Sequence, residues 1–216
     1  MSSPPSRPRI YHITHVDNLK SIAQCDELSS DGLCRNKNLS HKQVGMSEIK
    51  ARRLFELEVG CHLGTKVGEY VPFYFCPRSI MLYLFYRGNH PDLDYTEGQR
   101  PLVHLEADVH EVVQWAERKQ VHWAFSDRNA GTRYAVFYKN LSHLNKIDWN
   151  AVAATDFRDS NVKEGKQAEF LVYGTFPWVL VRRIGVCDQT VAKRATEALI
   201  GGGHQPVVSV EAGWYY

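Results

Sequence analysis

A carboxylate at position 169 is the residue of this sequence best placed to do chemistry. Glu169 stands in the stretch KQAEFLV (166–172), at the start of a β-forming run and directly after an irregular, charged loop. Gln167 lies two residues earlier, so in an extended chain both side chains share a face. If that face lines a cleft, an amide and a carboxylate meet the same ligand. The alternative is an ordinary glutamate, exposed to water at a strand end.

The segment from Arg35 to Arg53 is strongly basic. It carries six Lys/Arg and one acid, Glu48, a local surplus of five positive charges in a chain whose formal net charge is +2. Such a run suits phosphate groups, because an arginine fork binds two oxygens at once. The solvated face of a charged helix explains the same composition. The sequence therefore predicts an anion site or a charged helix here.

Two common kinds of site lack their motifs. The sequence has no G-x-G-x-x-G and no P-loop, and Gly201–Gly203 follows an expected helix, which indicates a helix end. His12 and His15 are three apart in an expected strand and so lie on opposite faces. No H-E-x-x-H or C-x-x-C occurs. We therefore expect no metal, and a nucleotide would need a non-Rossmann fold.

The elements that position these residues do not alternate strictly. Expected strands cover 9–13, 70–75, 101–107, 121–125, 168–173, 178–186 and 206–210. Expected helices cover 17–22, 46–59, 77–88, 108–119 and 188–200. Pro72 should place its strand at a sheet edge or a bulge. This order favours an α+β fold, with helices segregated around antiparallel or mixed sheets.

Length and composition indicate an ordinary globular protein. The 216 residues suit one domain or two small ones, and 44% hydrophobic and 23% charged residues are close to the globular norm. Residues 1–9 are polar and Pro-rich, which predicts a flexible tail before a domain over 10–216. The five cysteines are irregularly spaced, which favours reduced thiols in a cytoplasmic protein. No apolar run approaches the roughly 18 residues of a membrane helix, so we expect no membrane partner.

Several motifs together resemble DarT, the DNA ADP-ribosyltransferase toxin of the DarTG toxin–antitoxin systems. They are YHITHVDNLKSI (11–22), YVPFYFCPRSIMLY (70–83), FSDRNA (125–130) and KQAEFLV (166–172), joined by FPW (176–178) and WYY (214–216). Any one motif is weak, but their order and spacing over the chain after residue 9 are specific. The resemblance implies a single-domain ADP-ribosyltransferase fold: two packed β-sheets, surrounding helices and an NAD cleft.

The resemblance also implies the reaction. The family transfers ADP-ribose from NAD to a base in single-stranded DNA, in a sequence-dependent manner, and releases nicotinamide without a metal. Thymine is the favoured acceptor and guanine the other. A partner is implied as well, a macrodomain antitoxin that removes the modification. We expect a monomer. An enzyme acting on RNA or protein, or an inert nucleic-acid-binding module, is the alternative.

For the NAD site, the resemblance implies roles for two regions. The first strand and the helix after it would hold the nicotinamide end and line the pocket, with residues His12, Ile13, Thr14 and Ser21. The segment 35–53 would be the NAD-binding element, and Arg53 its essential arginine. Because the helix register is open, Arg52 is the alternative.

For catalysis, the resemblance assigns Glu169 as the catalytic glutamate, in a stretch from Asn129 that meets the target nucleotide. A carboxylate beside the ribose would stabilise the positive charge that develops as nicotinamide leaves. Glu169 or another group would take the proton of the base. Tyr74 and Met81 would contact NAD or the base, or belong to the core.

Overall fold

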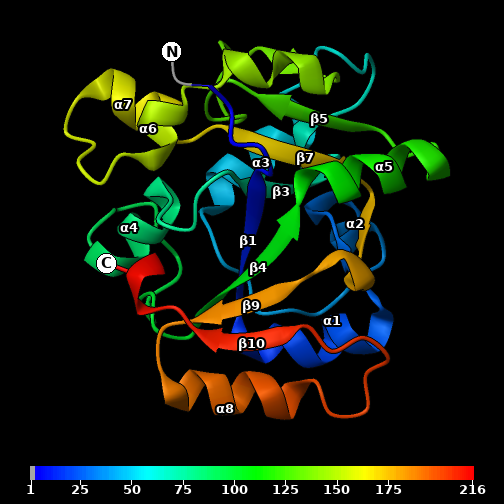
Figure 1. Cartoon of the computed structure of the whole chain (residues 1–216), viewed down its shortest axis with the longest axis vertical. Coiled ribbons are helices and arrows are strands. Elements are labelled where there is room, and N and C mark those ends of the chain that lie inside the picture. Colours follow the sequence, from blue (N-terminus) through cyan, green and yellow to red (C-terminus); the bar gives the residue numbers. More distant parts are fainter. Residues whose placement is uncertain (1–2) are drawn as a thin grey trace.

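The computed structural model describes residues 3–216, and a mixed sheet of eight strands runs through it (Figure 1). The strand order is β10-β9-β4-β1-β3-β7-β5-β6. The strands of this sheet are β1 (Arg9–His15), β3 (Tyr70–Tyr74), β4 (Leu102–Asp108), β5 (Trp123–Ser126), β6 (Phe137–Tyr138), β7 (Glu169–Tyr173), β9 (Arg183–Val186) and β10 (Val207–Val210). Its pairs are antiparallel except β9–β10.

The sheet has a seam at its centre. β1 pairs with β4 along its whole length, and β3 pairs with β7 along its whole length. β1 and β3, however, share one residue pair, Tyr11 with Tyr74. The sheet therefore consists of two four-stranded halves, β10-β9-β4-β1 and β3-β7-β5-β6, joined at a single point. We call the unpaired stretch between β1 and β3 the seam.

A second, small sheet completes the expected architecture. It pairs β2 (Glu27–Ser29) with β8 (Thr175–Pro177). The helices are α1 (Leu19–Cys25), α2 (Asp31–Asn36), α3 (Ser47–Phe55), α4 (Ile80–Arg87), α5 (Val109–Lys119), α6 (Trp149–Ala153), α7 (Ser160–Gly165) and α8 (Gln189–Ala198). The single-domain α+β prediction with two sheets is confirmed, although the sheets differ greatly in size.

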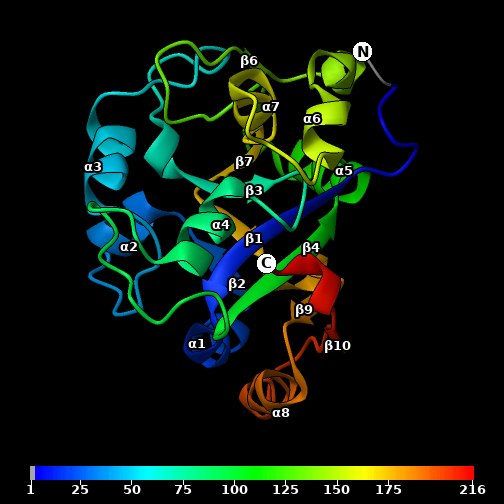
Figure 2. The same ribbon diagram turned by 90° about the vertical axis from the view of Figure 1, so that its left-hand side faces the viewer.

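Apolar side chains fill both faces of the sheet. One core joins the sheet to α1, α5 and α8, because residues such as Leu19, Val112 and Val191 pack against the inward side chains of β1 and β4. A second cluster places Leu82 and Phe85 of α4 against Tyr215 near the C-terminus. Figure 2 shows α4 and the C-terminus on the face toward the viewer, with α1 and α8 below them.

Local sequence signals set several helix ends. The Ser79 hydroxyl accepts a hydrogen bond from the Leu82 amide (3.1 Å), and Gly88 ends α4 with φ +58°. Asp108 caps α5 in the same way, by accepting from the amides of His110 and Glu111. These helices begin and end close to the predicted residues.

Pro72 does not lie at an outer edge, so that prediction is wrong: β3 lies inside the sheet, between β1 and β7. The carbonyl of Pro72 accepts a hydrogen bond from His12 Nδ1 across the seam (2.8 Å). In a strand, the N and C=O of one residue point to the same side, so the proline nitrogen also faces the seam. No ladder bond is needed there, which is why an interior strand tolerates proline.

Two other predicted elements are shorter than expected. The helix predicted over 46–59 ends at Phe55, because Leu57 and Val59 leave it to pack in an apolar cluster with Val67. The strand predicted over 178–186 is a 3₁₀ turn followed by β9, which begins at Arg183. Tertiary burial overrides local propensity in both places.

The N-terminal segment is more structured than a tail over 1–9 implies. Residues 1 and 2 lie outside the described residues. Arg9 is the first residue of β1, and Arg7 forms an ion pair with the buried Asp108 (3.1 Å). Over residues 3–216, no helix combines the length and the apolar character needed to cross a membrane.

Candidate active site

The centre of the candidate site is a bidentate ion pair between α3 and β7. Arg53 donates from both terminal nitrogens to Glu169, at 3.0 Å to Oε1 and 2.8 Å to Oε2. Glu169 is 1% exposed and the Arg53 side chain 12%. Arg52 instead reaches out toward the carbonyl of Gly131 (3.5 Å). The structure thus brings Arg53, and not Arg52, to the carboxylate.

The backbone around Glu169 is fixed by β5 and the loop after it. The Glu169 amide donates to the Ser126 hydroxyl (3.1 Å), and the Ala130 amide donates to Glu169 Oε1 (3.0 Å). Lys166, three residues earlier, is buried and donates to the Val152 carbonyl (2.9 Å). Each contact ties the start of β7 to a different element, so the carboxylate has little freedom to move.

α3 and α2 supply the remaining charges of the site. Lys50 lies one helical turn before Arg53 and pairs with Asp31 of α2 (3.0 Å). Burial alone lowers the pKa of Arg53, but the charge and hydrogen bonds of Glu169 outweigh it, and the pKa is raised. The guanidinium is therefore permanently charged. Two cations and two carboxylates meet here, in a compact and charge-balanced cluster.

Tyr74 shares this face of the sheet. It is the cross-strand partner of Glu169 in β7, so the two side chains point the same way. Burial and the negative charge of Glu169 raise the pKa of the Tyr74 hydroxyl, which therefore stays protonated at neutral pH. The expected cleft-side position of Tyr74 agrees with this geometry. Met81 instead packs against the apolar cluster of α4 and the C-terminus.

The four expected NAD-binding residues outside α3 differ in their surroundings and hydrogen bonds. His12 lies at the seam, near Asp31 and Lys50, and burial lowers its pKa. Because the Pro72 carbonyl can only accept, His12 Nδ1 carries the proton and Nε2 is an acceptor. Thr14 is buried and its hydroxyl accepts from Asn18 (3.1 Å).

The side chains of Ile13 and Ser21 make contacts away from the Arg53–Glu169 pair, while the backbone of Ile13 lies at the seam. Ile13 points to the opposite face from His12 and packs against the cluster around α4. Ser21 is exposed on α1, and its hydroxyl donates to the Asn18 carbonyl (2.9 Å). It makes no hydrogen bond to Arg53 or Glu169. The structure therefore brings His12 to the cluster and leaves Ser21 apart from it.

A polar cavity of about 320 Å³ lies between the loop after β5, α7 and the residues that precede β7. Its lining comes from the loop after β5, from α7 and from the residues before β7: Arg128, Asn129, Thr132, Tyr134, Ser160, Lys163, Glu164 and Gln167. The Asn129 amide donates to Gln167 Oε1 (3.0 Å), which joins the two sides of the cavity. This cavity lies in the stretch from Asn129 to Glu169 that the resemblance assigned to the target nucleotide.

Four groups of the site escape sequence reasoning. Asp31 begins α2 without a distinguishing pattern, Ser126 belongs to the FSDRNA motif but is given no role by it, and Lys50 is one of six cations in its segment. Ala130 contributes its backbone amide, for which no sequence signal exists. In the described part of the chain, no three His, Cys, Asp or Glu side chains are arranged to hold a metal ion.

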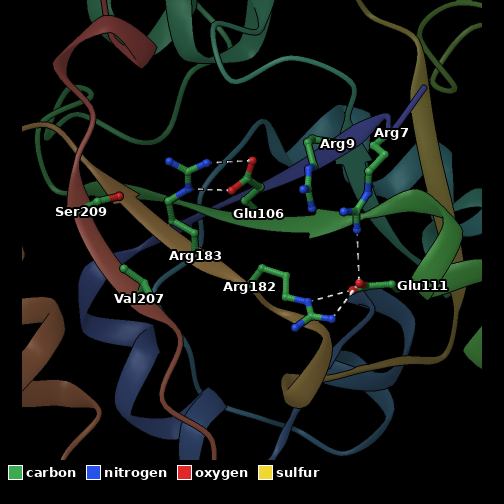
Figure 3. Close-up of a pocket in the computed structure, with 8 residues that line it drawn as sticks. All are labelled: Arg7, Arg9, Glu106, Glu111, Arg182, Arg183, Val207 and Ser209. Carbon is green, nitrogen blue, oxygen red and sulfur yellow. Dashed lines mark hydrogen bonds and ion pairs between the residues drawn. The ribbon is translucent and has the colours of Figure 1, made fainter. Parts of the chain in front are cut away.

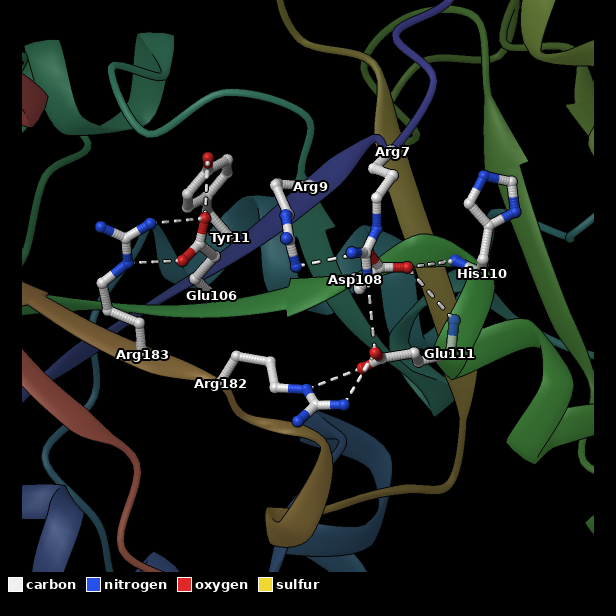
Figure 4. Close-up of polar contacts among 9 residues, drawn as sticks. All are labelled: Arg7, Arg9, Tyr11, Glu106, Asp108, His110, Glu111, Arg182 and Arg183. Carbon is white, nitrogen blue, oxygen red and sulfur yellow. Dashed lines mark hydrogen bonds and ion pairs between the residues drawn. The ribbon is translucent and has the colours of Figure 1, made fainter.

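A larger cavity, of about 500 Å³, lies over β4 and β9 and has different chemistry (Figure 3). Its arginines are Arg7, Arg9, Arg182 and Arg183. Each pairs with a carboxylate: Arg7 and Arg9 share Asp108, Arg182 pairs with Glu111, and Arg183 pairs with Glu106 (Figure 4). Arg182 and Arg183 in particular are held within 2.7 Å of their partners. This network stabilises the outer strands, and it does not contribute to the site around Glu169.

Comparisons with known proteins agree with this geometry. A family model described as ssDNA thymidine ADP-ribosyltransferase, DarT, matches residues 11–216. The chain belongs to the DarT family. Within that family, a DNA ADP-ribosyl transferase of Thermus aquaticus is 38% identical over 209 residues, which cover 96% of this chain and 88% of that protein.

Solved DarT structures share the whole fold. The DarT of Thermus sp. 2.9 in complex with ADP-ribosylated ssDNA superposes with a TM-score of 0.88 at 33% identity, over 100% of this chain and 99% of that one. The same Thermus protein in complex with NAD+ gives a TM-score of 0.80 at 31% identity, over 99% and 100%. The fold, the DarT family and its NAD-dependent transferase class are thus shown.

Proposed function

We propose that this protein transfers ADP-ribose from NAD+ to a base of single-stranded DNA, with thymine as the favoured acceptor. The observation that carries the proposal is the buried Arg53–Glu169 pair between α3 and β7 of a DarT-family fold. NAD+ supplies the ADP-ribosyl group and the nicotinamide leaving group when it is bound. The protein supplies charge, orientation and a place for the proton.

The residues at the seam fit a dinucleotide. Arg53 and Lys50 bring positive charge to this region, and a diphosphate would take over donors that are now paired with Glu169 and Asp31. His12 Nε2 is an acceptor suited to a ribose hydroxyl. Past Tyr11, the backbone of β1 has no ladder partner in β3. Its free N–H and C=O groups match the donor and acceptor of a carboxamide, as the nicotinamide end requires.

Glu169 is the group we assign to the reacting ribose. A fixed carboxylate beside C1′ stabilises the positive charge that develops as the bond to nicotinamide breaks. The new bond then forms between C1′ and a base nitrogen, which loses its proton. The raised pKa of Arg53 makes it a poor proton acceptor. We therefore assign the proton to Glu169 and an electrostatic role to Arg53.

The acceptor base would enter from the polar cavity between the loop after β5 and α7. Asn129 and Gln167 present amide groups there, and amides can read the edge of a base by pairing donors with acceptors. Lys163 lines the same cavity and offers positive charge to a phosphate, whereas Arg128 is paired there with Asp127 and Glu164. A single-stranded substrate is required, because the base must leave any stack to reach the ribose.

Such an activity implies a partner and a location. An enzyme that modifies its own cell's DNA needs an antagonist, and the family resemblance points to a macrodomain antitoxin that removes ADP-ribose. We propose that the protein acts in the cytoplasm as a monomer. Residues of a single chain bury Glu169, and the site around it needs no residue from a second copy.

Mass spectrometry of oligonucleotides tests the function. The protein is incubated with NAD+ and four single-stranded oligonucleotides that each lack one of the four bases, with RNA and protein substrates in parallel. The expected result is a gain of one ADP-ribose on every DNA oligonucleotide except the one that lacks thymine. Loss of labelling only without guanine would change the acceptor. Labelling of RNA or protein alone, or none at all, would refute the proposal. A Glu169→Gln variant is the control for enzyme-dependent labelling.

A further inference from the structure

Four aromatic rings from three distant parts of the chain form one cluster, which we call the aromatic platform. Tyr83 and Tyr86 come from α4, Phe157 from the connection between α6 and α7, and Tyr216 from the C-terminus. Tyr83 lies 5.1 Å from both Phe157 and Tyr216 between ring centroids, and Tyr86 stacks on Tyr216 at 6.1 Å. Figures 1 and 2 both show these three segments together.

The platform is open to solvent yet firmly built. Tyr86 is 53% exposed, and the other three rings are half-buried. Two hydrogen bonds fix Tyr216 in place. Its hydroxyl donates to the Arg78 carbonyl (2.9 Å), and its amide donates to Gln99 Oε1 (3.1 Å). Exposed aromatic rings on a rigid support are what base stacking needs. An ordinary core would bury them instead.

An arginine without a carboxylate partner accompanies the rings. The Arg78 guanidinium lies over the Tyr216 ring, 4.3 Å from its centroid. Arg78 forms no ion pair in the described part of the chain, and its buried Nε has no hydrogen-bond partner. Most other arginines here are paired with acids. Arg78 therefore keeps its positive charge for a ligand, and a phosphate or a base edge satisfies it.

Nearby acids do not oppose a polyanion. Asp156 is held by Arg158 next to Phe157. The carboxylate of Asp159 caps α7, where it accepts from two backbone amides. Arg158 thus balances the charge of Asp156, Asp159 is directed toward the α7 amides, and Arg78 is a cation without an acidic partner beside the rings.

The platform lies close to the reacting centre. Tyr74 is the cross-strand partner of Glu169, and Arg78 follows it by four residues. A chain of four residues spans at most about 14 Å. Along the axis of a duplex, one strand advances about 3.4 Å per phosphate, and an extended strand advances further, so this span corresponds to at most about four nucleotides. A strand whose base reaches Glu169 thus has neighbours within reach of the platform.

We propose that the aromatic platform, with Arg78, is a stacking site for the nucleotides that flank the modified base. The inference rests on the proposed function and adds a subsite to it. Because every base has a flat face, stacking here strengthens binding of the strand without fixing its sequence. Recognition of the acceptor itself stays with the polar cavity between the loop after β5 and α7.

Steady-state kinetics with Tyr86→Ala and Phe157→Ala test the platform. Loss of one base–aromatic contact should raise KM for a long oligonucleotide about fivefold or more. The Kd of NAD+, measured by calorimetry, should not change. Single abasic sites are placed at each flanking position in turn. At one or two positions, they should raise KM for the wild type and have no further effect on the variants.

Tyr173→Ala is the matched control. Tyr173 is a partly exposed tyrosine four residues along β7 from Glu169, at the end of the strand away from the platform. It should leave KM for the oligonucleotide unchanged. If wild-type enzyme labels DNA while the platform variants keep its KM, or if abasic sites weaken variants and wild type alike, the platform is not a DNA site. If the wild type labels no DNA, the proposed function itself fails.

Discussion

Glu169→Gln should weaken the fold as well as the reaction, because it leaves Arg53 without its counter-charge. Glutamine is close to glutamate in size and keeps one oxygen for the Ala130 amide and Arg53. The second carboxylate oxygen is replaced by an amide NH2 group, which points its hydrogens at the Arg53 nitrogen that is now 2.8 Å from Oε2. An attractive contact becomes a repulsive one in a site that is almost closed to water.

The size of the effect follows from burial. Removal of one partner from a buried ion pair costs about 3–5 kcal/mol of unfolding free energy. The Arg53 side chain is 12% exposed and one hydrogen bond survives, so we expect the lower end, about 3 kcal/mol. For a domain of this length, that corresponds to a fall in Tm of roughly 6–12 °C. The variant should still fold, because domains typically have about 5–15 kcal/mol of stability.

Urea unfolding followed by tryptophan fluorescence gives the measurement, with Arg53→Gln and the double variant completing a cycle. The double variant should be more stable than the sum of the two single losses indicates, because both charges are gone together. If Glu169→Gln unfolds at the same urea concentration as wild type at pH 7, Arg53 and Glu169 do not form this pair in solution. The assignment of Arg53 as the electrostatic partner would then be wrong.

Two further perturbations test other parts of the structure. Burial lowers the pKa of His104 to about 4, whereas the pKa of this histidine in the unfolded chain is near 6.5, so the unfolded chain takes up the proton first as the pH falls. The free energy of unfolding should therefore fall by about 3 kcal/mol between pH 6.5 and pH 4. Urea midpoints of a His104→Asn variant should depend less on pH than those of the wild type. Gly185→Ala would place a Cβ 2.2 Å from the Trp214 ring, so it should displace the C-terminal segment and cost about 1–3 kcal/mol in thermal unfolding. Gly213→Ala, where nothing lies within 4 Å, should behave as wild type.

Local sequence signals predict many of the helix and strand boundaries of the fold. The cap at Ser79 and the stop at Gly88 define α4 because each satisfies backbone groups within four residues. Where distant contacts decide, local reasoning fails. Leu57 and Val59 have the character of a continuing helix, yet the helix ends because both find partners in another cluster. Pro72 was misplaced because the seam, an internal gap, has no local signal.

The candidate site shows the same difference between local signals and distant contacts. Arg53 and Glu169 are 116 residues apart, and residue types alone left Glu169 equally consistent with an exposed strand end. Motif order over the whole chain indicated Glu169 and Arg53, with Arg52 left open as the alternative arginine. The geometry of the pair, and the Ala130 amide that completes it, depend on how the loop after β5 folds over β7. No pattern of side chains encodes the direction of one backbone amide.

The seam lowers the free-energy cost of inserting a ligand between two strands. In a fully laddered sheet, a molecule that inserts between two strands must first break main-chain hydrogen bonds. Here β1 and β3 have already parted beyond Tyr11 and Tyr74, so a planar amide can take the place of the missing strand neighbour. A ligand bound at the seam would then supply the missing hydrogen bonds between β1 and β3. It would thereby connect the two halves of the sheet.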